Sequence, residues 1–157
     1  MRISRLFAPL LLLAAAPAPV MAPGLWQETL VFALDSVNGS QEAASQMQGT
    51  LPSPRPRSDC YTAADLADPR GLFLAGAEQS CRFSHFVMAN GRIEATGDCS
   101  DQQGQTMHVT GNGQYSASGY DFTFTGTGQA GRLSLAFRGR DSGRRIGECP
   151  APGTPHP

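Results

Sequence analysis

The sequence contains no lysine, so all twelve basic residues are arginine, and thirteen acidic residues leave a formal charge of −1. A chain without surplus positive charge lacks the electrostatic character of a basic nucleic-acid-binding protein. Charged residues make up only 16% of the chain and hydrophobic residues 40%, which excludes a disordered acidic or basic tail. Repeated long apolar runs are also missing, which excludes a polytopic membrane protein. With 157 residues, the chain has the length of about one domain.

The N-terminal apolar stretch is short and follows two arginines, Arg2 and Arg5. Small residues then lead to Ala22, which is the layout of a Sec-type secretory signal peptide. We therefore predict a signal peptide over residues 1–22 and a periplasmic or secreted protein of a Gram-negative envelope. Pro17, Pro19 and Pro23 each directly follow an alanine that could end a cleavage site, and proline just after the cut disfavours cleavage. Cleavage after Ala15 and retention of the segment therefore stay open as alternatives to cleavage after Ala22. Membrane association, if any, would come only from an uncleaved segment.

Four cysteines become informative in an exported chain, because an even number in an oxidising compartment predicts disulfides. They are Cys60, Cys81, Cys99 and Cys149. None belongs to a C-x₂-C pair of the kind that zinc sites use, so we predict no metal and no cofactor.

One hairpin helps to choose among the three possible pairings. Asn90-Gly91 is a preferred two-residue turn between two alternating segments, and it predicts that Met88 pairs with Ile93. In that register Cys99 lies opposite Arg82 on the apolar face, while Cys81 points to the other face. We therefore predict the pairs Cys60–Cys81 and Cys99–Cys149. A three-residue loop would instead place Cys81 against Cys99, at the expense of the apolar match.

Short segments of alternating polarity recur along the rest of the chain and predict β-strands. Glycine-rich pieces, including 111–113 and 126–131, are predicted as turns. The segments with strand patterns are 25–34, 81–88, 92–99, 105–110, 120–125 and 132–138.

Two segments depart from the strand pattern. Residues 35–58 are polar and proline-rich and are predicted to form a long loop, with at most an edge strand over residues 47–51. Thr62-Ala-Ala-Asp65 resembles a capping box and predicts a short helix over 63–66.

The expected fold is therefore all-β with one short helix, an antiparallel meander curved into an open barrel or sandwich and clipped by disulfides. We assign residues 23–150 to this single domain and residues 151–157 to a disordered tail.

A set of short motifs occurs along the chain in order. They are Pro23-Gly24-Leu25-Trp26, Cys60-x-Thr62, Asp68-Pro69, Cys81-x-Phe83, Gly91-Arg92-Ile93-x-Ala95 up to Cys99, and Arg144-Arg145-Ile146-Gly147-Glu148-Cys149. Together they resemble the exported bacterial family catalogued as domain of unknown function 3617, over nearly all of the chain after the signal segment. The resemblance implies export and a β-rich domain. It implies no catalytic residues, because the family has no established activity.

Motifs that suggest chemistry have simpler interpretations. Gly126-x-Gly128-x-x-Gly131 matches a dinucleotide fingerprint, but a strand pattern follows it where that fingerprint needs a helix. His85 and His108 are expected to face solvent, on the side of the sheet away from the apolar residues. Trp26 is expected to close one end of the core rather than to stack on a ligand.

The leading hypothesis is a non-catalytic binding or envelope-associated module, because a curved sheet offers a concave apolar face. Its partner would be an unknown protein, an envelope component or an apolar ligand, and not a nucleic acid. One alternative is a hydrolase-type or metal-assisted enzyme that uses His85 or His108 with a nearby carboxylate. Another is a purely structural envelope or stress protein.

Overall fold

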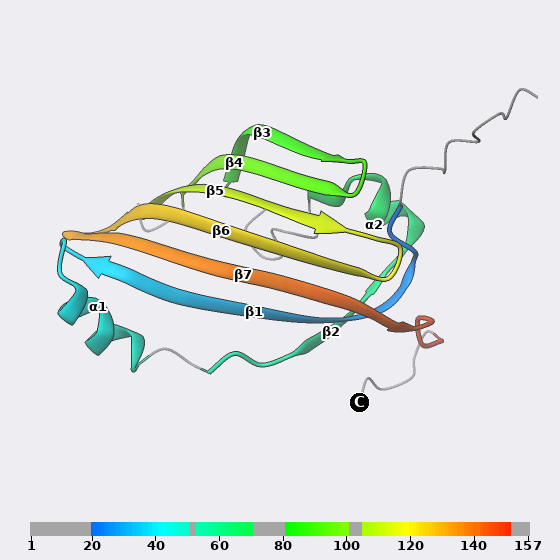
Figure 1. The fold of residues 1–157 in the computed structure, drawn as a ribbon, viewed down its shortest axis with the longest axis horizontal. Coiled ribbons are helices and arrows are strands. Elements are labelled where there is room, and N and C mark those ends of the chain that lie inside the picture. The colour runs from blue at the N-terminus through cyan, green and yellow to red at the C-terminus, as the bar shows by residue number, and fades with distance from the viewer. Residues whose placement is uncertain (1–19, 51–52, 71–80, 101–104, 152–157) are drawn as a thin grey trace, which may run out of the picture.

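The computed structural model describes residues 20–50, 53–70, 81–100 and 105–151. Seven antiparallel strands form one sheet in the order β2-β1-β7-β6-β5-β4-β3, curved but not closed (Figure 1). The strands are β1 (Gly24–Val37), β2 (Arg57–Tyr61), β3 (Cys81–Ala89), β4 (Arg92–Ser100), β5 (Thr106–Tyr115), β6 (Gly119–Ala130) and β7 (Leu133–Gly147). The predicted all-β meander, curved and open, is confirmed.

Two short helices accompany the sheet, α1 (Gln41–Gln48) and α2 (Ala63–Ala67). They lie near opposite ends of it (Figure 1). The capping box predicted for α2 is present, because the Thr62 and Asp65 side chains each accept a hydrogen bond from the other's backbone amide. The described part of the chain contains no helix with the length and hydropathy of a membrane span.

The predicted loop over 35–58 is wrong at both ends and in the middle. β1 continues to Val37, α1 occupies residues 41–48, and β2 begins at Arg57. The sequence hides α1 because its residues are mostly polar and only Ala44 is buried. The helix is held by contacts with β1 instead: the Gln48 side chain donates to the Phe32 carbonyl (3.1 Å) and accepts from the Leu34 amide (2.8 Å). Through these bonds α1 protects the edge of β1 beyond Glu28, where the pairing with β2 ends.

Glycines that the sequence suggested as turns lie inside strands. Gly111 and Gly113 belong to β5, and Gly126 and Gly128 to β6; of the predicted 126–131 loop, only Gly131 forms the turn. Two of these glycines, and two more in β7, lie under aromatic rings of the neighbouring strand, where a Cβ atom would overlap the ring. Such pairs join Gly111 to Phe122, Gly126 to Phe137, Gly139 to Phe124 and Gly143 to Tyr120. The rings take the space of the absent side chains, which lets the strands pack closely where the sheet curves.

The hairpin turn at Asn90-Gly91 is confirmed, with Met88 opposite Ile93. The predicted register fails farther along, because a β-bulge between Phe83 and His85 adds one residue to β3. Cys81 therefore lies opposite Cys99, and the apolar match near the turn is kept. The bulge also turns Phe83 toward the core cluster.

Both predicted disulfide pairs are wrong: the bonds join Cys81 to Cys99 and Cys60 to Cys149. The bulge explains the first bond. The second follows from strand order, because Leu25 of β1 pairs with Cys60 on one side and with Gly147 on the other. The ends of β2 and β7 thus flank the same residue, and the Cα atoms of Cys60 and Cys149 are 5.5 Å apart.

The core lies on the concave face near α2, where Trp26 is fully buried, as predicted. Met21 belongs to the same cluster and is 4% exposed. The Ala22 amide donates to the Ala117 carbonyl (3.0 Å), and the Ala22 carbonyl accepts from the Trp26 indole (3.1 Å). The packed fold therefore begins before Pro23, the predicted domain start. Most of the predicted signal peptide and residues 152–157 of the predicted tail lie outside the described residues.

In protein that retains residues 20–22, replacing Met21 with alanine should lower the free energy of unfolding by about 2–3 kcal/mol, because it opens a cavity in the core. Val20→Ala is the matched control: Val20 is 71% exposed, so its loss should change stability by less than about 0.5 kcal/mol. Urea denaturation measures both. Equal effects of the two substitutions would show that Met21 does not pack into the core.

Digestion of the oxidised protein without reduction should release peptides joined through Cys60–Cys149 and through Cys81–Cys99, identified by mass spectrometry. Replacing Cys81 and Cys99 with serine should cost about 3 kcal/mol, and replacing Cys60 and Cys149 about 4.5 kcal/mol, because the second bond closes the longer loop. The sequence separations are 18 and 89 residues. Peptides that join Cys60 to Cys81 would contradict the strand order.

Candidate functional site

A cavity of about 410 Å³ lies on the concave face of the sheet. Most of its wall is apolar, and five of the seven strands contribute aromatic or large aliphatic side chains to it. These are Leu30, Phe32, Phe83, Phe86, Met107, Val109, Phe122, Phe124 and Phe137. Leu30 and Met107 are 53% and 42% exposed, so part of this wall is open to solvent. The volume lies in the range typical of small-molecule sites.

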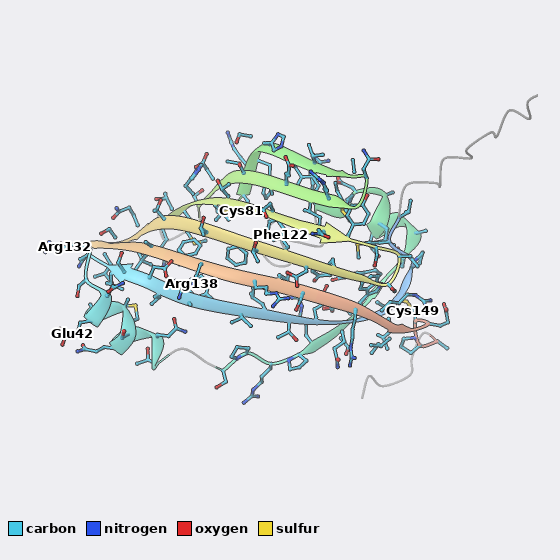
Figure 2. All side chains as sticks on the ribbon, in the orientation of Figure 1. Glu42, Cys81, Phe122, Arg132, Arg138 and Cys149 are labelled. Atoms are coloured by element: carbon cyan, nitrogen blue, oxygen red, sulfur yellow. A yellow bond between two sulfur atoms is a disulfide. The ribbon has the colours of Figure 1, made fainter. Side chains whose placement is uncertain are left out.

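Neighbouring rings make the wall continuous from strand to strand. Phe32 lies 5.2 Å from Phe137 between ring centroids, and Phe137 lies 6.5 Å from Phe124 in an edge-to-face arrangement. Phe122 stacks beside Phe124 at 6.2 Å. Figure 2 labels Phe122 near the middle of the sheet, between Arg132 at one end and Cys149 at the other. Contacts of this kind hold the rings in place, so the wall is formed before any ligand arrives.

A buried carboxylate lies between the apolar wall and the core cluster. Glu28 is 1% exposed, and both its oxygens are occupied. Oε1 accepts from the hydroxyl groups of Tyr61 and Tyr120 (2.7 Å from Tyr120), and Oε2 accepts from Arg57 Nε (2.9 Å) and pairs with Arg57 Nη2 (2.8 Å). Burying a carboxylate is costly unless it is hydrogen-bonded and paired, and Glu28 is both.

The tyrosines of this cluster stay protonated. Burial and the hydrogen bond to Glu28 raise the pKa of Tyr61 far above its usual range, and burial together with the charges of Asp141 and Glu28 does the same for Tyr120. Partial burial opposes ionisation of Arg57, but the Glu28 carboxylate outweighs it and raises the pKa of the guanidinium. The two tyrosine hydroxyl donors and the Arg57 charge therefore persist across the physiological pH range.

Asp141 is the titratable member of the cavity wall. Burial raises the pKa of its carboxyl to about 6, and the negative charge of Glu28 adds to the shift. The Tyr120 hydroxyl, 3.3 Å from Asp141 Oδ1, and the positive charge of Arg57 act in the opposite direction. Asp141 can therefore change its protonation state inside an apolar cavity at mildly acidic pH.

The two histidines lie outside the apolar cavity, on separate strands, and face solvent as predicted. His85 Nε2 is 3.5 Å from Glu94 Oε2, and His108 Nδ1 is 2.7 Å from Asp98 Oδ1. Both histidine side chains are slightly more than half exposed. His108 lines a wider depression of about 650 Å³, together with Asp98 and several serines and threonines. The structure thus gives each histidine its own carboxylate but does not bring the two histidines into one enclosed site.

Sequence reasoning missed the residues that make up the polar end of the cavity. One signal was available: Glu28 alternates in phase with Trp26 and Leu30, so it had to point inward with them. A carboxylate in phase with buried apolar residues needs buried partners. Its actual partners, Arg57 and Tyr61, lay within and just after the segment interpreted as a loop.

Within the described ranges, no group of three or more histidine, cysteine, aspartate or glutamate side chains is placed to hold a metal ion.

Asp141→Asn should change how stability depends on pH. Because the folded pKa of about 6 exceeds the ordinary value of 3.8, Asp141 stabilises the fold fully below about pH 4, and this contribution is lost as the pH rises through about 6. The variant lacks that loss. Its stability relative to the wild type should therefore rise by about 2 kcal/mol between about pH 4 and about pH 7.5, after allowance for partial exposure. Urea denaturation at several pH values measures this, and parallel pH profiles would contradict the assignment.

Comparison with known proteins supports one assignment. No curated protein and no solved structure gives a significant match to the chain. The model of one family, described as a protein of unknown function (DUF3617), matches residues 21–149. Its first matched residue is Met21, the buried residue that precedes β1, and its last is Cys149, which closes the longer disulfide. The chain belongs to the DUF3617 family.

Proposed function

We propose that the protein is an exported, non-catalytic binding module that takes up an apolar ligand in the concave-face cavity. The observation that carries this proposal is the continuous aromatic wall around about 410 Å³ of space, with Leu30 and Met107 partly exposed at it. Removing apolar surface of this kind from water is favourable, and a ligand does so without refolding the sheet. Two disulfides support an oxidising compartment such as the periplasm.

The test is binding of a neutral fluorescent probe, N-phenyl-1-naphthylamine, to the purified oxidised protein. We expect saturable binding, and displacement of the probe by a neutral single-chain detergent below its micelle concentration. Leu30→Gln should weaken probe binding about 10-fold, which corresponds to about 1.4 kcal/mol of lost apolar contact.

Val31→Gln is the matched control for this substitution. Val31 is the next residue of β1, is 46% exposed, and lines a depression with Arg138 and Arg140 instead of the apolar cavity. We expect it to leave probe binding unchanged. A protein that shows no saturable binding would contradict the proposal and favour a purely structural envelope role. Equal loss in both variants would show that the probe does not occupy this cavity.

A further inference from the structure

We infer that the ligand of this cavity is a single-chain amphiphile with an anionic head group, which Arg55 binds. This inference rests on the proposed function and names the chemistry of the ligand. It rests on the charged side chains at the cavity and on which of them already have a partner within the protein.

Among the described residues, three charged side chains line the cavity: Arg55, Arg57 and Asp141. Arg57 is committed, because it pairs with Glu28 and also lies 3.2 Å from Asp59 Oδ2. Glu28 in turn has no free oxygen for a ligand, since two tyrosines and Arg57 occupy both. The fixed charges of this cluster are therefore satisfied within the protein.

Arg55 differs from Arg57 in having no such partner. It lies in the extended segment that leads into β2, it is exposed, and it forms no ion pair or side-chain hydrogen bond with any other described residue. Its guanidinium therefore offers a positive charge and planar N–H donors, none of them bound to another described residue, at a cavity with a mostly apolar wall. This geometry suits the two oxygens of a carboxylate, phosphate or sulfate group.

The charge of Asp141 changes how tightly an anionic head group binds, but the charge that attracts the head group is that of Arg55. The carboxyl carries a full negative charge only well above pH 6, because burial and Glu28 favour its protonated form. The groups that face it are Glu28 from β1, Tyr120 from β6 and Arg57 from β2. An anionic head group should therefore bind more tightly at pH 5 than at pH 8, where ionised Asp141 repels it.

The test compares three detergents that share a decyl chain: decyl sulfate, decyl maltoside and decyltrimethylammonium. Each is used below its micelle concentration, at low salt, to displace N-phenyl-1-naphthylamine from the oxidised protein. We expect decyl sulfate to bind about 3–5-fold more tightly than decyl maltoside, a modest factor because Arg55 is exposed to solvent. Arg55→Gln should remove this preference and leave the affinity for decyl maltoside unchanged.

Two further variants sharpen the result. Arg92→Gln removes the same charge from an exposed arginine that does not line the cavity, and it should keep the preference for decyl sulfate. Asp141→Asn should abolish the weakening of decyl sulfate binding between pH 5 and pH 8, which we expect to be about 2–3-fold. Sulfate stays ionised over that range, so the detergent itself does not titrate.

Each outcome separates this inference from the proposed function. If decyl maltoside binds as tightly as decyl sulfate and Arg55→Gln has no effect, the anionic head group is ruled out while the apolar site stands. Tighter binding of decyltrimethylammonium, or equal effects of Arg55→Gln and Arg92→Gln, would also overturn the inference. If the probe itself shows no saturable binding, the proposed function fails as well.

Discussion

The burial of the Glu28 carboxylate constrains how the strands of this protein meet. A carboxylate that is 1% exposed needs several donors, and here they come from two other strands: Arg57 and Tyr61 from β2, and Tyr120 from β6. β2 is the shortest strand and pairs with β1 over five residues only, so these side-chain bonds add to a limited backbone ladder. The same cluster forms the boundary between the packed core and the open cavity. The position of β2, the closure of the core and the polarity of the cavity therefore all depend on one side chain.

Much of the fold follows from local sequence patterns, and the errors arise where distant residues decide. Alternation predicted the strands and the Asn90-Gly91 turn, because both depend on neighbouring residues. Alternation could not show that in-strand glycines lie under rings of the next strand, as Gly111 does under Phe122. Such glycines look like turns in a single sequence, since glycine is frequent in both places. The pairing of β1 with β7 was equally invisible, because most of its partners are more than a hundred residues apart in the sequence.

The site was less predictable than the fold, for a related reason. The concave apolar face was expected from the strand pattern, whereas its polar end combines Glu28, Arg57 and Asp141 from three strands. The single inserted residue in β3 had the largest effect on the disulfide assignment. It shifts the register by one, turns Phe83 toward the core and brings Cys81 opposite Cys99. A bulge has no distinctive composition in this segment, so only the three-dimensional pairing reveals it.

The two disulfides are nested, with Cys81–Cys99 enclosed by Cys60–Cys149. In the oxidising compartment proposed for this protein, a chain that emerges N-terminus first presents Cys60 and Cys81 to an oxidant before Cys99 and Cys149 have appeared. Joining successive cysteines at that stage produces a bond that the finished sheet does not contain. Reaching the native arrangement therefore requires that Cys60 stay reduced until β7 is complete, or that a thiolate attack the early bond and exchange it. The order in which the strands become available thus makes maturation of this small domain dependent on disulfide exchange or on delayed oxidation.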